Sequence, residues 1–132
     1  MIDTLGAGDF IQLRGHADLQ EVYPQYELYV TTSQWETFGL TLMEAVGAGL
    51  ALVGFDARYG NPTFIKDGKN GYLIPYNETM DEDLLVSQMA EKILFALEGD
   101  LESMHQASYE LAKQYLKPEI LEAWRKLLIA IR

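Results

Sequence analysis

The chain has 132 residues, of which 48% are apolar and 23% are charged, and its formal net charge is −10. These values are typical of one globular domain, and the negative charge argues against nucleic acid as a partner, since nucleic acid binds clustered Lys and Arg. The absence of cysteine excludes disulfides and thiolate-bound metals. No apolar run reaches the roughly 18 residues of a membrane-spanning helix. We therefore expect a cytoplasmic protein, with a peripheral position at the membrane left open.

Residues 1–80 alternate strand-like and helix-like segments, and residues 81–132 are helical in character. Strands are predicted in four segments rich in apolar or β-branched residues: Phe10–Arg14, Leu28–Thr32, Leu50–Phe55 and Tyr72–Ile74. Helices are predicted at Leu19–Gln25, Leu40–Ala48, Pro62–Lys66, Leu84–Leu97, Leu101–Tyr115 and Ile120–Ile131. The alternation predicts a single α/β domain over residues 1–132, with a Rossmann-like parallel sheet, flanking helices and a helical C-terminal tail that packs against the sheet.

Three distinctive loops follow predicted strands, at Gly15–Ala17, Ser33–Gly39 and Asp56–Pro62. The carboxyl ends of parallel strands meet at one edge of a sheet, and ligands bind there in such folds. We therefore expect these loops to form one site.

The segment Ser33–Ala45 carries the strongest functional signal. Glu36 stands before a glycine turn, and Glu44 lies on the helix that follows it. Gly39 allows a ligand to approach the backbone, and the free N–H groups of a helix start attract anions. A phosphate cradle flanked by two carboxylates suits a nucleotide sugar. In so acidic a chain, the phosphate must be bound by backbone amides or by a few cations, of which the candidates are Arg14, Arg58, Lys66 and Lys69.

The acidic residues allow other interpretations. Two carboxylates about 5–10 Å apart could be a glycosidase pair, although a glycine turn with a helix start suits phosphate better. Glu36 and Glu44 could also be ordinary surface charges. Asp81-Glu82-Asp83 matches a D-x-D metal motif, but it opens a helix, where acidic residues cap the end and complement the dipole. No His/Asp/Glu cluster has the spacing of metal ligands, so we predict no metal and no other cofactor.

The pattern from Glu36 to Glu44, E-x7-E with Phe-Gly-Leu inside it, resembles the signature of retaining glycosyltransferases of family 4, which have the GT-B fold. Asp56–Asn61 is similar to the family's glycine loop, and Ile65–Pro75 resembles its Gly-x-x-Gly turn. Phe55–Asn61 and Arg14–Asp18 resemble bacterial enzymes that place N-acetylglucosamine on Ser/Thr of serine-rich-repeat adhesins, whose relatives glycosylate poly(glycerol-phosphate) teichoic acid.

The resemblance implies a role for each matching residue toward a UDP-sugar donor. Glu36, the catalytic residue, would hold sugar hydroxyls beside the backbone of Thr37, Phe38 and Gly39. The amides of Leu40 and Thr41 would face the distal phosphate, Glu44 would bind the ribose, and His16 and Ala17 would contact the base. The family usually carries Pro-Glu after its glycine loop, but this chain has Pro62-Thr63, so no role passes to that position.

The resemblance further implies that the chain is part of the C-terminal, donor-binding domain of a hexosyltransferase. Such an enzyme transfers a hexose or N-acetylhexosamine to protein Ser/Thr or to a cell-wall polymer, and the chain alone would be inactive. The Arg and Lys that neutralise the diphosphate would lie upstream. The alternative is a non-catalytic module that binds a nucleotide sugar or stabilises a partner, since similar enzymes work with a glycosyltransferase-like subunit. The intact Glu36/Glu44 pair favours the catalytic partner.

Overall fold

The centre of the fold is a parallel sheet of three strands in the order β1-β2-β3, seen in a computed structural model that describes residues 1–131. The strands are β1 (Leu28–Thr31), β2 (Ala51–Phe55) and β3 (Gly71–Ile74). Leu28 is in register with Ala51, and Phe55 with Ile74. Every residue of β2 is buried, as expected for the central strand of a parallel sheet that is covered on both faces.

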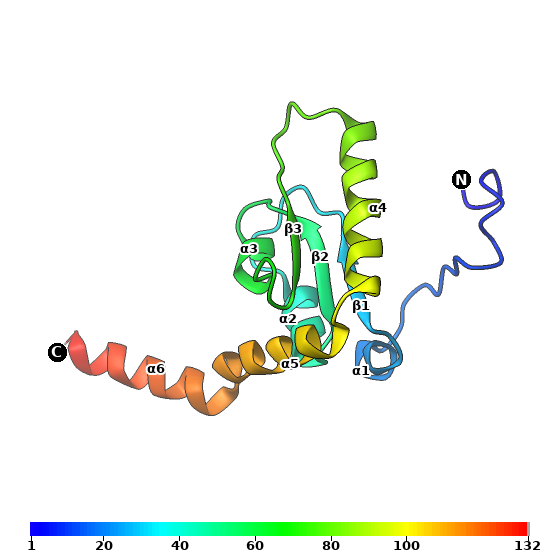
Figure 1. The fold of residues 1–132 in the computed structure, drawn as a ribbon. Coiled ribbons are helices and arrows are strands. Elements are labelled where there is room, and N and C mark those ends of the chain that lie inside the picture. Colours follow the sequence, from blue (N-terminus) through cyan, green and yellow to red (C-terminus); the bar gives the residue numbers. More distant parts are fainter. Residues whose placement is uncertain (132) are drawn as a thin grey trace.

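Helices cover both faces of this sheet. They are α1 (Leu19–Val22), α2 (Leu40–Gly47), α3 (Gly60–Phe64), α4 (Glu82–Glu98), α5 (Leu101–Ala112) and α6 (Lys117–Ala130), with 3₁₀ turns η1 (Tyr23–Gln25) and η2 (Lys113–Tyr115). One apolar cluster contains Leu42, Phe64 and Leu111, from α2, α3 and α5. The other includes Leu85 and Met89 of α4, which lies along the other side of the strands (Figure 1). The predicted Rossmann-like α/β class is confirmed.

The strand predicted at Phe10–Arg14 is wrong. Residues 11–18 form no regular element, and the side chains of Phe10 and Leu13 are 77% and 87% exposed. A strand needs a neighbour to take its N–H and C=O groups, and the described sheet pairs β1 only with β2. Figure 1 shows this N-terminal segment reaching away from the sheet.

The helix predicted at Pro62–Lys66 starts and ends earlier, at Gly60 and Phe64. The side chain of Asn70 explains where it stops. Its Oδ1 accepts a hydrogen bond from the N–H of Lys66 at 2.7 Å, and its Nδ2 donates to the carbonyl of Phe64 at 3.0 Å. These contacts take the place of the next helical hydrogen bonds, so the chain leaves the helix and turns into β3.

The helical tail is confirmed as helical, and its caps follow the sequence. Asp81 accepts a hydrogen bond from the N–H of Leu84 at 3.1 Å, and Asp100 accepts one from the N–H of Ser103 at 3.1 Å. Hydrogen bonds from the Ser103 side chain and backbone lower the pKa of Asp100. The cap interpretation of Asp81-Glu82-Asp83 is therefore confirmed. A transmembrane segment is not found among the helices of residues 1–131.

The expectation that the whole tail packs on the sheet is wrong for α6. None of its residues is buried, and Trp124, Leu128 and Ile129 are exposed. In Figure 1, α6 extends away from the body of the protein, continuing past α5. The amphipathic pattern of α6 predicts a helix, but it does not show whether another part of the protein covers the apolar face of that helix.

A buried polar chain fastens α5 to the sheet. Ser108 donates from Oγ to the carbonyl of Leu50 at 2.7 Å, and it accepts a hydrogen bond from Nδ2 of Asn70 at 3.2 Å. Both Ser108 and Asn70 are almost fully buried. Because buried polar atoms are costly to leave unpaired, this chain fixes how α5 meets the start of β2 and β3.

The substitution Ser108→Ala tests this chain of hydrogen bonds. We expect it to lower the free energy of unfolding by about 1–3 kcal/mol, because interior partners lose a hydrogen bond. Chemical denaturation measures the loss. Ser87→Ala, at an exposed position on α4, is the matched control and should stay within about 0.5 kcal/mol of the parent. Equal effects of the two changes would show that the buried chain adds nothing.

Candidate functional site

The loops after β1 and β2 are bonded to each other along the carboxyl edge of the sheet. The N–H of Glu36 donates to the carbonyl of Arg58 at 3.0 Å, and the carbonyl of Glu36 accepts from the N–H of Gly60 at 2.7 Å. Buried Asn61 donates from Nδ2 to the carbonyls of Phe55 at 2.8 Å and Ser33 at 3.3 Å. The two loops therefore form one unit, and the backbone of Glu36 is fixed within it.

Two glycines make room for the side chain of Glu36. A Cβ atom on Gly60 would lie 2.7 Å from Cγ of Glu36 and 2.5 Å from the carbonyl oxygen of Phe38. A Cβ atom on Gly39 would lie 3.3 Å from Cγ of Glu36 and 2.7 Å from Cδ1 of Leu42. Glu36 is half-buried, so its stem occupies a slot that side chains at these two positions would close.

The first turn of α2 presents unpaired backbone donors. Gly39 precedes the helix with φ 87° and ψ 62°, a left-handed conformation suited to glycine, and supplies no capping side chain. Throughout residues 1–131, no hydrogen bond uses the N–H of Leu40, Thr41 or Leu42. Leu40 is 63% exposed. Free N–H groups at the positive end of a helix dipole are suited to bind an anion.

A pocket of about 800 Å³ lies along the flank of α2 and brings together His16, Ala17 and Glu44. These are the three residues predicted to bind the nucleoside. Glu44 follows Leu40 by one helical turn, or about 6 Å along the axis. Glu36 and residues 37–41 do not line this pocket. The predicted site thus follows a path from this pocket along α2 to Gly39, whose backbone lies against the side chain of Glu36.

Tyr23 is a pocket residue that the sequence analysis missed. Its side chain is only 8% exposed, packs edge-on against Tyr29 with ring centres 5.8 Å apart, and donates from its hydroxyl to the carbonyl of Thr41 at 3.4 Å. Tyr29 donates to Oγ1 of Thr41 at 2.9 Å. The pKa of Tyr23 is raised to about 12, first by burial and then by the electrostatic effects of Tyr29 and Glu44. The two tyrosines hold the first turn of α2, and no motif in the sequence marks them.

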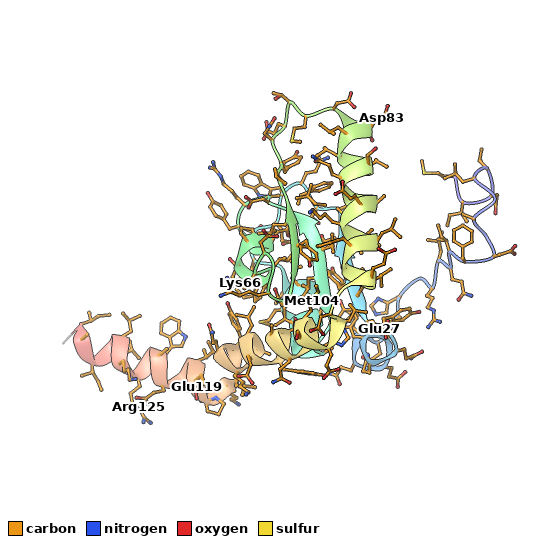
Figure 2. All side chains as sticks on the ribbon, viewed as in Figure 1. Glu27, Lys66, Asp83, Met104, Glu119 and Arg125 are labelled. Carbon is orange, nitrogen blue, oxygen red and sulfur yellow. The ribbon has the colours of Figure 1, made fainter. Side chains whose placement is uncertain are left out.

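The lysines do not lie at this edge. Lys66 and Lys69 precede β3, and Figure 2 shows Lys66 low on the body, whereas Asp83 marks the opposite end, where α4 begins. Lys66 donates from Nζ to the carbonyl of Pro62 at 3.2 Å. Arg14 lies over the ring of Tyr26, 5.9 Å from its centre. These three cations are therefore poor candidates for phosphate binding in this structure, and Arg58 alone remains at the carboxyl edge.

Other residues singled out in the sequence have structural partners. Thr63, at the position where the resemblance would place a Glu, donates from Oγ1 to the carbonyl of Tyr59 at 2.7 Å. Within residues 1–131, no three His, Asp or Glu side chains come together in a way that could hold a metal ion. The absence of a metal cofactor stays a prediction.

Comparison with known proteins decides the family. A family model described as glycosyl transferases group 1 matches residues 1–114. The chain belongs to this family. It is 52% identical to the UDP-N-acetylglucosamine--peptide N-acetylglucosaminyltransferase GtfA subunit of Streptococcus gordonii, over 99% of this chain and 26% of that relative.

Solved structures agree with this assignment. The pneumococcal O-GlcNAc transferase GtfA in complex with UDP and GlcNAc is similar with a TM-score of 0.89 and 50% identity, over 98% of this chain and 26% of that one. The GtfA/B complex is similar with a TM-score of 0.92 at the same identity and coverage. The neighbouring structures are GT-B glycosyltransferases. The chain spans about a quarter of the length of these relatives.

The raised pKa of Tyr23 predicts a pH dependence of stability. Below pH 10 both folded and unfolded chains keep the proton; between pH 10 and about 12 the unfolded chain loses it while the folded chain holds it, so the free energy of unfolding falls. In Tyr23→Phe the free energy of unfolding should fall less between pH 10 and about 12, because the contribution of the Tyr23 hydroxyl is absent. Denaturation at a series of pH values measures both slopes, and identical slopes would contradict the assignment.

Proposed function

We propose that this chain is the donor-binding part of a retaining family 4 glycosyltransferase that transfers N-acetylglucosamine from UDP-N-acetylglucosamine to Ser/Thr hydroxyls of a peptide. The observation that carries the proposal is the pocket of His16, Ala17 and Glu44 that opens one helical turn from the free amides of α2. The family membership, and the likeness to a structure that contains UDP and GlcNAc, support the same donor.

The parts of the donor are assigned along this path. The uracil sits at His16 and Ala17, mainly against their backbone, and Glu44 accepts hydrogen bonds from the ribose hydroxyls. The distal phosphate is bound by the amides of Leu40 and Thr41, and Glu36 orients the sugar through its hydroxyls. The half-buried stem of Glu36 and its bonded backbone support such positioning, because a fixed group loses little freedom when the sugar binds.

The chemical task is to stabilise the negative charge that builds on the departing diphosphate while the sugar becomes cation-like. Amides already aimed from the start of a helix do this without reorganisation. They also add no net charge, which suits a chain with a net charge of −10. No side chain on the path is assigned as a covalent nucleophile.

A partner subunit is part of the proposal. The similar structure of the GtfA/B complex supports it, and the acceptor peptide follows the printed name of the S. gordonii relative. A non-catalytic, partner-stabilising module is the second candidate, and the presence of both Glu36 and Glu44 favours the catalytic role. The cytoplasmic location predicted from the sequence belongs to the same proposal.

Substitution of the two glutamates tests the roles in the full-length polypeptide that carries this chain. Glu44→Ala should weaken UDP binding roughly tenfold or more, since hydrogen bonds to a charged group are lost. Glu36→Ala should leave UDP affinity nearly unchanged and lower kcat about 100-fold, because it contacts the sugar alone. Calorimetry with UDP and steady-state kinetics separate the two effects.

The matched control for both is Glu91→Ala, at an exposed position on α4, and it should change neither quantity. Equal and negligible effects of Glu36→Ala and Glu44→Ala would remove the assigned roles. Loss of UDP binding in Glu36→Ala with normal binding in Glu44→Ala would reverse them.

Removal of divalent metal tests the proposed metal-free binding. The affinity of the full-length polypeptide for UDP should be the same with and without EDTA, because backbone amides rather than a metal ion meet the phosphates. Calorimetry in the two buffers measures it. A tenfold loss of affinity in EDTA, restored by added Mg²⁺ or Mn²⁺, would overturn this part of the proposal.

A further inference from the structure

The first turn of α2 is held from outside the helix by two tyrosine hydroxyls. Tyr29, on β1, donates to Oγ1 of Thr41 at 2.9 Å, and Tyr23, in η1, donates to the carbonyl of Thr41 at 3.4 Å. Thr41 is the second residue of α2, and within residues 1–131 its own N–H has no hydrogen-bond partner. Both tyrosines therefore bond to oxygen atoms of this turn and leave its N–H groups open.

We propose that Tyr29, supported by Tyr23, is a positioning residue for donor binding. It holds the first turn of α2 so that the N–H groups of Leu40 and Thr41 face the diphosphate. The inference rests on the proposed function, because it needs these N–H groups to bind phosphate. It adds that affinity for the diphosphate, and not affinity for the nucleoside, depends on the hydroxyl of Tyr29.

The start of α2 is the first argument. A helix commonly begins after Ser, Thr, Asp or Asn, whose side chain accepts a hydrogen bond from an N–H of the first turn. Asp81 and Asp100 do this at the starts of α4 and α5. Gly39 holds this position before α2 and has no side chain that could do it. A capping side chain would compete with a phosphate for the same N–H groups, whereas the tyrosine hydroxyls stabilise the turn without that competition.

The anchoring of the two rings is the second argument. Tyr29 lies on β1 in register with Leu52 of the central strand, and its ring packs edge-on against Tyr23, with centres 5.8 Å apart. Tyr23 is buried in the same apolar cluster as Leu42 of α2. A hydroxyl on a ring that is already fixed loses little conformational freedom when it forms a hydrogen bond. Such a hydroxyl can therefore restrict the movement of the turn that it contacts.

Tyr29 offers the cleaner test of the two tyrosines. Tyr23 lines the pocket assigned to the nucleoside, and Tyr29 does not. Substitution of Tyr23 would thus change the wall of that pocket as well as the turn, whereas the hydroxyl of Tyr29 contacts Thr41. Tyr109 supplies a matched control at the other end of α2, because its hydroxyl donates to the carbonyl of Ala48, the C-cap residue, at 3.1 Å.

The test uses the full-length polypeptide that carries this chain, with UDP and uridine as ligands. Tyr29→Phe keeps the ring and removes the hydroxyl. It should weaken UDP binding about fivefold, the effect of one lost hydrogen bond, and change the affinity for uridine less than twofold. Tyr109→Phe should change neither affinity. Calorimetry measures UDP binding, and a ligand-observed NMR titration measures uridine binding.

A double-substitution cycle shows whether Tyr29 acts through Thr41. Thr41→Val removes the oxygen atom that accepts the hydrogen bond, and it should also weaken UDP binding. The variant with both Tyr29→Phe and Thr41→Val should bind UDP no more weakly than the weaker of the two single variants, because both changes remove the same contact. Losses that multiply would show that Tyr29 acts by another route and would overturn the positioning role.

The two ligands and the control separate the remaining outcomes. The positioning role is overturned by unchanged UDP affinity in Tyr29→Phe, by an equal loss of UDP and uridine affinity in that variant, or by an equal loss of UDP affinity in Tyr109→Phe. Retained uridine binding shows that Tyr29→Phe is folded. Failure of the parent polypeptide to bind UDP defeats the proposed function itself, whereas normal UDP binding by both the parent and Tyr29→Phe defeats the positioning role alone.

Discussion

The main chain of Glu36 lies between Arg58 and Gly60 of the neighbouring loop and bonds to both, and the side chain of Asn61 ties the roots of the two loops together. The rest of the site depends on this pairing. It fixes the backbone of Glu36 at the carboxyl edge of the sheet. It also places Gly60 against Cγ of Glu36, where there is no room for the Cβ atom of another residue. Because Asn61 is buried and bonds to two carbonyl groups, the two loops are held together by the protein itself.

Binding of a diphosphate, as proposed, by so acidic a chain involves an electrostatic conflict, and the start of α2 offers a local solution to it. The long-range field of a chain with a net charge of −10 would repel the proposed ligand. At contact distance the free amides of the first turn and the helix dipole act without adding net charge. Tyr23 and Tyr29 donate to Thr41, through its carbonyl and its hydroxyl, and so hold that turn in place without using its N–H groups. The carboxylate of Glu44 lies one turn further along, where hydroxyls rather than phosphates are proposed to bind.

The sequence predicts the features that depend on neighbouring residues, and it does not predict those that depend on residues far along the chain. The three strands lie within a residue or so of their predicted positions, because apolar runs bounded by turns are local signals. They are Leu28–Thr31, Ala51–Phe55 and Gly71–Ile74. The grouping of His16, Ala17 and Glu44 was implied by the family resemblance and not by the rule for carboxyl-edge loops, because residues 11–18 follow no strand in the structure. Whether Phe10–Arg14 pairs, and whether α6 finds a surface, depend on distant partners that no window of sequence contains. The contacts of Tyr23 and Asn61 are of the same kind, since Tyr23 bonds to Thr41, 18 positions away, and Asn61 bonds to Ser33, 28 positions away.

The position after the glycine loop shows how a departure from a family pattern can be read physically. Where the resemblance places a carboxylate, Thr63 donates its hydroxyl to the carbonyl of Tyr59 and so serves the first turn of α3. That hydroxyl is therefore already bonded within the protein. Among the acidic residues at this edge, Glu36 is the one whose side-chain stem is enclosed by two glycines and whose backbone N–H and C=O are both bonded to the neighbouring loop. The proposed orientation of the sugar thus rests on one enclosed carboxylate, that of Glu36.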